Sequence, residues 1–308
     1  MAEHILVIGA TLLDVKGIPT DGLEPETSNP AEIRSSRGGT ARNVAENLAR
    51  LGADVVLISA TGDDDIGRQL TEQTAATGVD VENVHVAPDR NTGSYMAVLD
   101  PDGTLSVALD DTRAMDTITS QYLYRRRRLF RDASTIMFDG SLPPSSVATI
   151  IKLARQYENV LVADPSSTRM AYKLSPYLDT LSLVVPNEVE AATLCGTDYF
   201  GYDTDASLEA ARQLLNMGVG IAVVTLSDFG LAYATSDESG YIPPRYSEMA
   251  DSTGTGDAIT AAIIFGMVNE LPTTECVRLG AAAAGLTLQS HHTVVPNLSL
   301  DLLYEHLY

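Results

Sequence analysis

Short apolar runs rich in Val, Ile and Leu alternate with longer amphipathic segments along most of the chain. Such runs, bounded by turn residues, are typical of strands buried in a parallel sheet. The predicted strands are residues 5–8, 55–58, 135–138, 160–163, 181–185 and 221–225. The helical spacing of apolar positions between them predicts helices at residues 40–51, 66–77, 145–157, 188–194, 206–217, 256–269 and 273–289. This alternation predicts an α/β fold with a doubly wound, mainly parallel sheet flanked by helices.

Two segments interrupt the alternation. Residues 12–35 are rich in Pro, Gly, Asp and Glu, and residues 92–110 carry a hairpin pattern with strands at 94–99 and 104–109 around a turn at 100–103. Strands outside the parallel sheet would form a small second layer, and a lid over one edge of the main sheet is the natural use of such a layer. Neither a repeat nor a linker divides the chain, so we expect one domain spanning residues 1–308.

The composition narrows the choice of partners and compartment. The 20 basic and 41 acidic side chains give a net charge of −21, which excludes nucleic acids and anionic membranes as expected partners because both would be repelled. The hydrophobic share of 44% predicts a folded core. Cys195 and Cys276 lack the spacing of a zinc site or a disulfide framework, which favours a reducing compartment. Since the sequence has no secretory leader pattern and no long apolar stretch, we expect a cytoplasmic protein.

The segment 251–257, Asp-Ser-Thr-Gly-Thr-Gly-Asp, carries the strongest chemical signal. Gly254 and Gly256 allow backbone N–H groups to converge where a helix begins, and such a helix end attracts anions. Asp257 is electrostatically out of place there unless it handles a proton, so it is a candidate general base for a hydroxyl that attacks phosphorus. The alternative is a Gly-rich turn in which Asp257 only caps the helix. The sequence has neither a Walker A loop nor a dinucleotide-binding Gly-x-Gly-x-x-Gly after the first strand.

A second glycine pair, Gly38 and Gly39, precedes another amphipathic helix. Glycines at this position permit close backbone approach to a ligand, and Asn43, one turn into the helix, offers a donor and an acceptor to a polyol. Asp14 lies just beyond the first strand, where open α/β sheets bind their ligands, and its carboxylate could accept two hydroxyls of a sugar. The alternative is that Asp14 and Asn43 only satisfy turns and helix caps.

Three motifs together resemble one family. Gly38-Gly39 with Asn43, the segment Pro-Asn-Glu-Val-Glu at 186–190, and the segment 251–257 occur in the order and at the spacing of the ribokinase-like (PfkB) carbohydrate kinases. The resemblance covers the chain from residue 5 to the C-terminal helix. Within the family, residues 39–52, 92–103, 164–167 and 286–299 look most like those of pseudouridine kinases.

The resemblance implies a ribokinase-like fold and a kinase that uses ATP and Mg²⁺. It implies that Asp257 is the catalytic base and that the backbone amides of Gly254, Thr255 and Gly256 form an anion hole for the migrating phosphoryl group. It further implies that Asn187 and Glu190 organise Mg²⁺ and phosphate, largely through water, as suits an ion that keeps part of its hydration shell.

The resemblance also implies contacts with nucleotide, substrate and a monovalent cation. The implied nucleotide residues are Thr225, Ser227, Gly230, Thr253, Gly254 and Gly256. The implied substrate residues are Asp14, Gly38, Gly39 and Asn43, with Tyr95 available from the lid. Asp251 and Thr253 lie where several members bind a monovalent cation such as K⁺, with later ligands near residues 290–293. Lid strands often pair between subunits in this family, which makes a homodimer through the lid an expectation.

The sequence departs from the family pattern at a few positions. Ser227 stands where the family often has glycine, Thr255 replaces the commoner alanine, and Ala281 falls near a frequent asparagine. The favoured function is phosphorylation of a ribosyl-type primary hydroxyl, with pseudouridine converted to pseudouridine 5′-phosphate. The alternatives are a kinase for ribose, fructose, another sugar or a purine nucleoside, and a ligand-binding regulator without catalysis.

Overall fold

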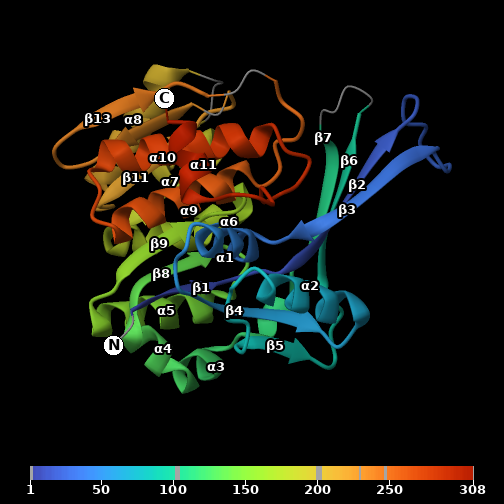
Figure 1. Ribbon diagram of the computed structural model, residues 1–308, viewed down its shortest axis with the longest axis horizontal. Helices are drawn as coiled ribbons and strands as arrows, with labels where there is room; N and C mark the ends of the chain where they lie inside the picture. Colours follow the sequence, from blue (N-terminus) through green and yellow to red (C-terminus); the bar gives the residue numbers. More distant parts are fainter. Residues whose placement is uncertain (1–2, 101–104, 199–202, 229, 246–247, 308) are drawn as a thin grey trace.

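The structure of the chain, a computed structural model, describes residues 3–100, 105–198, 203–228, 230–245 and 248–307. Within these residues the strands form two sheets, one of nine strands and one of four (Figure 1). We call them the main sheet and the small sheet. The small sheet projects from one side of the main sheet, toward the upper right of Figure 1, while the helices cover both faces of the main sheet.

The main sheet has the order β13-β12-β11-β10-β9-β8-β1-β4-β5. Pairing is parallel from β5 to β11, and only β12 and β13 are antiparallel additions at one edge. The strands are β1 (His4–Ile8), β4 (Val55–Gly62), β5 (Val84–Ala87), β8 (Ala133–Asp139), β9 (Val160–Asp164), β10 (Leu183–Val184), β11 (Ile221–Thr225), β12 (Leu231–Ala234) and β13 (Ser239–Ile242).

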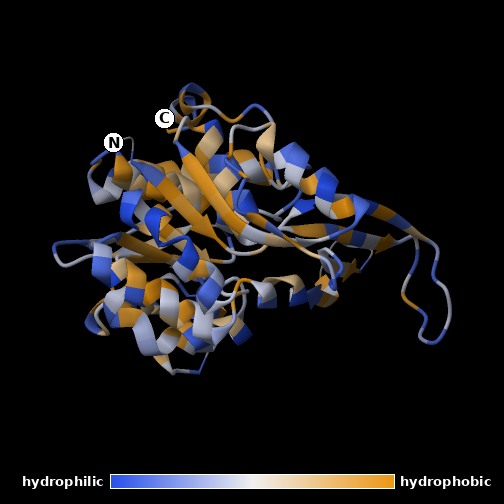
Figure 2. Cartoon of the chain, turned by 90° about the horizontal axis from the view of Figure 1, so that it is seen from below, coloured by the Kyte–Doolittle hydropathy of each residue, from blue (hydrophilic) through white to orange (hydrophobic). Residues whose placement is uncertain are grey.

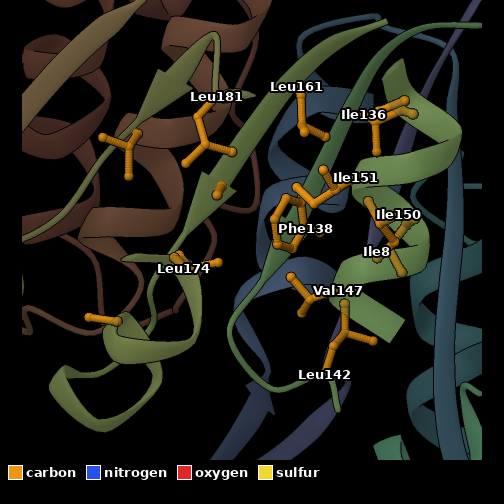
Figure 3. Close-up of a cluster of buried hydrophobic side chains, with 14 of the residues drawn as sticks. Ile8, Ile136, Phe138, Leu142, Val147, Ile150, Ile151, Leu161, Leu174 and Leu181 are labelled. Atoms are coloured by element: carbon orange, nitrogen blue, oxygen red, sulfur yellow. The ribbon is translucent and has the colours of Figure 1, made fainter. Parts of the chain in front are cut away.

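Alternate residues of the buried strands pack into two separate cores. Leu6 and Ile8 of β1 contribute to the core under the helix α5, whereas Ile5 and Val7 contribute to the core on the opposite face. This division follows from the two-residue period of a strand, which sends successive side chains to opposite faces. Figure 3 shows Ile8 and Phe138 packed against Val147 and Ile151 of α5 in the first core.

The helices belong to one core or the other. The first core holds buried residues of the helices α3 (Ser120–Arg125), α4 (Arg127–Asp132), α5 (Pro144–Tyr157), α6 (Thr168–Leu174), α7 (Glu188–Cys195) and α8 (Thr204–Asn216), and of the 3₁₀ helices η1 (Arg113–Thr117) and η2 (Ser175–Thr180). The second holds buried residues of α1 (Thr40–Arg50), α9 (Thr255–Val268), α10 (Thr273–Leu288) and α11 (Leu300–Glu305). The helix α2 (Asp65–Ala75) contacts β4 and β2.

The small sheet is built from the two segments that interrupt the α/β alternation. Its order is β3-β2-β6-β7, with β2 (Leu12–Pro19), β3 (Ala31–Gly38), β6 (Gly93–Leu99) and β7 (Leu105–Asp111). In register, Asp14 lies opposite Tyr95 and Tyr95 lies opposite Asp110, so these three side chains share one face. Figure 2 shows the hydrophobic strands inside the body of the molecule and the small sheet projecting from it.

The expected α/β fold with a mainly parallel sheet and a second small layer is confirmed. Each predicted helix and main-sheet strand has a counterpart, but the strand expected at 181–185 is shorter, because only Leu183–Val184 pairs as β10. The hairpin turn expected at 100–103 lies outside the described residues beyond Asp100. No helix among the residues described here is both long and apolar enough to span a bilayer.

Candidate active site

A cavity of about 550 Å³ lies between the small sheet and the carboxyl ends of the central strands of the main sheet. Ligands of open α/β sheets bind at this edge. The lining residues are Ala10, Leu12, Asp14, Gly39, Thr40, Asn43, Tyr95, Ala108, Asp110, Thr112, Asp139, Ser141, Ser166, Ser167, Met170, Thr253 and Asp257. Four of the five predicted substrate residues therefore meet the predicted base, although they come from separate parts of the chain.

Asp257 lies in the first turn of α9 and faces this cavity. Burial raises the pKa of its carboxyl to about 7, against the opposing effect of a hydrogen bond from Asn43 and with a smaller contribution from the charge of Asp14. The turn before it needs Gly254, which has φ 82° and whose missing Cβ would lie 2.1 Å from the carbonyl oxygen of Thr293. A carboxyl with pKa near 7 is suited to accept a proton at neutral pH.

The turn at residues 251–256 is called the anion-binding turn after its predicted role, and the helix α9 that it leads into begins with a residue that departs from the family pattern. Thr255, at the first position of α9, is buried, and its Oγ1 has no hydrogen-bond partner among the described residues. The departure from alanine therefore places an unsatisfied hydroxyl beneath the first turn of the helix. Such a group costs free energy when it is buried without a partner.

Asn43 contacts the predicted base on one side and a guanidinium group on the other. Its Nδ2 donates to Oδ2 of Asp257 at 2.6 Å, while its Oδ1 accepts a hydrogen bond from the guanidinium of Arg42. Arg42 is itself fully buried, and it donates to the carbonyl oxygen of Gly38 at 3.0 Å and to the carboxylate of Glu46. These contacts fix which end of the Asn43 amide faces Asp257.

The small sheet brings Asp14 and Tyr95 into the cavity. Burial raises the pKa of Asp14 to about 6, although the charges of Arg42 and Lys16 oppose the shift. Gly38 leaves room for this carboxylate, since a Cβ at that position would lie 2.0 Å from Oδ1 of Asp14. Gly39 starts α1 with φ 94° and allows close approach of the backbone at Ala10. Both glycines thus permit close contacts within the protein, and Gly39 also lines the cavity.

Two buried aspartates near the cavity were not among the predicted site residues. Asp139, at the end of β8, accepts hydrogen bonds from the backbone of Ala10, Ala41 and Ser141, and burial raises its pKa. Asp164, at the end of β9, has a pKa raised to about 7 by burial and by the charge of Asp257. Each directly follows a predicted strand, on the edge where α/β proteins bind ligands, which was a usable signal in the sequence.

Asn187 and Glu190 form a second group beside the first. They make a capping box at the start of α7, in which Asn187 Oδ1 accepts from the Glu190 backbone at 2.9 Å and Glu190 Oε2 accepts from the Asn187 backbone at 3.0 Å. Burial and the charge of Asp164 raise the pKa of Glu190 to about 7. A divalent cation would relieve the mutual repulsion of these buried carboxylates, so the donor set fits Mg²⁺. Because capping occupies two of the oxygens, the ion would be held largely through water.

The predicted nucleotide residues adjoin this group. Thr225, the last residue of β11, pairs with Asn187 in an isolated parallel bridge. The backbone N–H of Ser227 donates to Oε2 of Glu188 at 3.1 Å, and Gly230 closes the turn by donating to Asp228. Thr225, Ser227 and Gly230 do not line the 550 Å³ cavity, whereas Thr253, another predicted nucleotide residue, does. Asp164 connects the two groups electrostatically, since its charge contributes to the raised pKa of Glu190 and it responds to that of Asp257.

Asp251 and Thr253, the residues implied for a monovalent cation, contact a lysine of the small sheet. Lys16 Nζ lies 2.7 Å from Oδ1 and 2.6 Å from Oδ2 of Asp251, and it also donates to Oγ1 of Thr253. Burial opposes ionisation of Asp251, but the hydrogen bonds from Lys16 and Thr253 outweigh it and lower the pKa of the carboxyl. Sequence reasoning missed Lys16, because no pattern along the chain links it to a turn so distant in sequence.

Comparison with known proteins gives matches along almost the entire chain. The model of the pfkB family carbohydrate kinases matches residues 2–299. A pseudouridine kinase from Escherichia coli K12 is 32% identical over 97% of this chain and 94% of its own length. A guanosine-inosine kinase from Exiguobacterium acetylicum is 27% identical over 98% of this chain and 99% of its own.

Solved structures support the same assignment. A carbohydrate kinase from Agrobacterium tumefaciens superposes with a TM-score of 0.84 at 29% identity, covering 99% of this chain and 97% of that one. The fold, the site and these relatives define an ATP-dependent kinase of a sugar or nucleoside. The chain belongs to the pfkB family of carbohydrate kinases. A putative ribokinase II from E. coli, which covers 99% of each chain with a TM-score of 0.84 at 18% identity, was solved in complex with ATP and Mg²⁺.

Proposed function

We propose that this kinase phosphorylates the 5′-hydroxyl of a ribosyl substrate, with pseudouridine as the favoured acceptor and pseudouridine 5′-phosphate as the product. The observation that carries the proposal is the contact between Asn43 and Asp257 at the wall of a cavity that Asp14 also lines. It combines a carboxyl of pKa about 7 with polar groups able to bind hydroxyls. The similarity to a pseudouridine kinase supports the choice of acceptor.

In the proposed mechanism, Asp257 accepts the proton of the acceptor hydroxyl as its oxygen forms a bond to the γ-phosphorus of ATP. The bond between that phosphorus and the β,γ-bridging oxygen breaks, and ADP leaves. Backbone N–H groups at Gly254 and Gly256 face the charge that spreads over the transferred group. The N–H of Thr255 donates to the carbonyl oxygen of Ser252 at 3.3 Å and would join them by giving up that contact. Mg²⁺, when bound near Asn187 and Glu190, supplies further positive charge to the phosphates.

The cavity offers separate surfaces for a sugar and for a base. Asp14 and Asn43 supply an acceptor and an amide for ribose hydroxyls, close to Asp257. Leu12, Tyr95 and Met170 give apolar and aromatic surface, and the polar groups of Asp110, Thr112, Ser166 and Ser167 remain for the edge of a base. Pseudouridine presents two ring N–H donors where uridine presents one, so oxygen acceptors such as the Asp110 carboxylate favour it.

The nucleotide is proposed to bind at the second group, along the end of β11. Thr225, Ser227 and Gly230 provide a turn there. Thr253, Gly254 and Gly256 lie on the side of Asp257, the proposed catalytic base. The side chain at Ser227, where relatives often have glycine, limits how closely the backbone can approach the nucleotide. ATP thus lies between the anion-binding turn and the Asn187–Glu190 group.

The small sheet is proposed to act as a lid and as a dimer contact within one kinase domain spanning residues 1–308. One face carries Asp14, Tyr95 and Asp110 and covers the cavity. The other exposes Ile33 at 65%, Met96 at 50%, Val107 at 51% and Leu109 at 67%. Their register places these apolar side chains on a single face. We propose that a second copy of the chain packs against this face. A cytoplasmic location, where Cys195 and Cys276 stay reduced, completes the proposal.

The substrate assignment is tested by measuring ADP release with a panel of acceptors. The panel is pseudouridine, uridine, adenosine, guanosine, ribose and fructose. We expect the highest kcat/KM with pseudouridine and a clear loss with uridine, in which the same uracil ring is joined to ribose through N1 instead of C5. Preference for guanosine would favour the purine nucleoside alternative, and preference for a free sugar would refute a nucleobase site. Saturable binding of several compounds without turnover of any would indicate a ligand-binding regulator instead.

A further inference from the structure

Lys16 has a set of contacts that the proposed reaction does not use. It lies on β2, two residues after Asp14, so both side chains point to the same side of the small sheet. From there its ammonium reaches both carboxylate oxygens of Asp251 and the hydroxyl of Thr253. The three N–H donors of the ammonium are thereby matched by three oxygen acceptors.

This ion pair is sheltered from solvent. The side chain of Lys16 is 15% exposed and that of Asp251 is 28% exposed. Asp251 is further organised by its own turn, since its Oδ1 accepts from the Thr253 backbone at 2.9 Å. A sheltered pair of this geometry is screened less by salt than a surface ion pair.

The surrounding chain has the arrangement expected of a monovalent cation site. The backbone N–H groups of Ala250 and Asp251 donate to the carbonyl oxygen of Leu288, and Gly254 approaches the carbonyl of Thr293 closely. Residues 288–293 therefore lie against residues 250–254, as the family resemblance implies for K⁺ ligands. However, both oxygens of the Asp251 carboxylate are already bound to Lys16, so the residues present do not fit an additional cation there.

We infer that the ammonium group of Lys16 takes the place of the monovalent cation beside the anion-binding turn, and that this kinase works without K⁺. An ammonium group and a potassium ion carry the same charge and have similar size, and both bind carboxylate and hydroxyl oxygens. The lysine also does what a free ion cannot. It attaches the small sheet to the turn that starts α9, and so holds Asp14 and Asp257 on facing walls of one cavity.

The test compares the wild type with Lys16→Met, which keeps the length of the side chain and removes its charge. Lys152→Met is the matched control, because Lys152 is exposed on α5 and away from the cavity. Each protein is assayed in potassium chloride and in tetramethylammonium chloride at equal ionic strength. We expect the wild type and the control to give the same rate in both salts, and Lys16→Met to regain activity in potassium by on the order of tenfold.

A second measurement needs no acceptor or nucleotide. The thermal midpoint of the ligand-free protein should be indifferent to potassium for the wild type and the control, whereas potassium should raise that of Lys16→Met. Activation or specific stabilisation of the wild type by potassium would overturn the inference, even if the variant fails to fold. A folded Lys16→Met that ignores potassium would overturn it as well. If no acceptor is turned over, the proposed function fails, while the thermal midpoints still decide the role of Lys16.

Discussion

Asn43 lies between two opposite charges and cannot rotate without losing one of them. Its amide oxygen accepts from Arg42 and its amide nitrogen donates to Asp257. A reversed amide would place N–H donors against the Arg42 guanidinium and an oxygen acceptor against the Asp257 carboxylate. The hydrogen bond to Asp257 favours the ionised carboxylate, whereas burial favours the protonated one. The resulting pKa near 7 lets Asp257 exist as a carboxylate in a useful fraction of molecules at neutral pH and still bind a proton during the reaction.

The first prediction concerns the base itself. Asp257→Asn keeps the shape of the side chain but cannot accept the proton, so kcat should fall by a factor on the order of 10²–10⁴, the usual contribution of a general base. Binding of ATP, measured by calorimetry, should persist because the backbone groups of the turn remain. Asp237→Asn, at an exposed aspartate between β12 and β13, should retain full activity. Wild-type turnover by Asp257→Asn would exclude Asp257 as the base.

A second prediction follows from the pKa of the same carboxyl. Only ionised Asp257 can act, so kcat/KM for the acceptor should rise with pH and level off above a midpoint of about 7. Asn43→Leu removes the hydrogen bond that lowers this pKa, and the midpoint should therefore move to higher pH. If Asn43 only binds substrate, KM would rise and the midpoint would stay where it is. Rates at saturating and limiting acceptor across the pH range distinguish the two roles.

At the scale of elements, α1 depends on an ion pair that is completely removed from water. Arg42 and Glu46, one turn apart, both have fully buried side chains, and Glu46 also contacts Arg37 and Arg50, whose side chains are partly exposed. Arg42 in addition binds the carbonyl oxygen of Gly38, just before the helix. The start of α1, and with it Gly39 and Asn43, is thus positioned by charge from within the protein.

A third prediction uses the two arginines of this network. Arg42→Met should reduce the free energy of unfolding by about 3–5 kcal/mol, as expected when a buried ion pair loses one partner. Arg50→Met is the matched control, because Arg50 contacts the same carboxylate from a site that is 19% exposed, and its loss should cost less. Urea denaturation measures both. Equal losses would mean that burial of Arg42 contributes nothing particular to α1.

Some of these elements could be predicted from the sequence alone, and others could not. Strands such as residues 5–8 and helices ending before Gly52 and Gly218 follow from local signals, namely β-branched runs and glycines with φ of 93° and 101°. The short strands β12 and β13 mix Ala, Ser and Gly with Leu, Tyr and Ile, a pattern too short to predict a strand, and they form because β12 pairs with β11 and β13 pairs with β12. Likewise, the meeting of Asp14, Asn43 and Asp257 follows from motif order, whereas the ion pair of Lys16 with Asp251 is visible only in three dimensions.

On the scale of the whole molecule, the outer face of the small sheet exposes several apolar side chains that the described residues leave uncovered. The fourth prediction is that the protein is a dimer and that Leu109→Glu, at the 67% exposed Leu109, shifts it toward monomers. Val86→Glu is the control, because Val86 is 51% exposed but lies on β5 of the main sheet. Sedimentation velocity over a range of concentrations measures the change. A monomeric wild type, or a dimer that both variants leave intact, would refute this contact.

The net charge of −21 has its clearest consequence at the site, where burial raises the pKa of several carboxyls. Their pKa values are raised to about 6 for Asp14 and about 7 for Asp164, Glu190 and Asp257. Each of these groups holds its proton more tightly in the folded protein than in the unfolded chain. Their contribution to stability is therefore complete below the unfolded pKa values near 4 and is lost as pH rises through about 6 to 7.

The fifth prediction is that the ligand-free protein is less stable at a pH of about 8 than at about 5, because these carboxyls must ionise within the fold. Asp164→Asn removes one of them while keeping an oxygen to accept from the Ser166 backbone, so its stability should fall less over the same range. Asp237→Asn, at an exposed position, should follow the wild type. Mg²⁺ should raise the thermal midpoint more at the higher pH, where the carboxylates are charged. The prediction fails if the stability of the wild type rises from the lower to the higher pH and Asp164→Asn shows an identical slope. These groups would then ionise as freely in the folded protein as in the unfolded one.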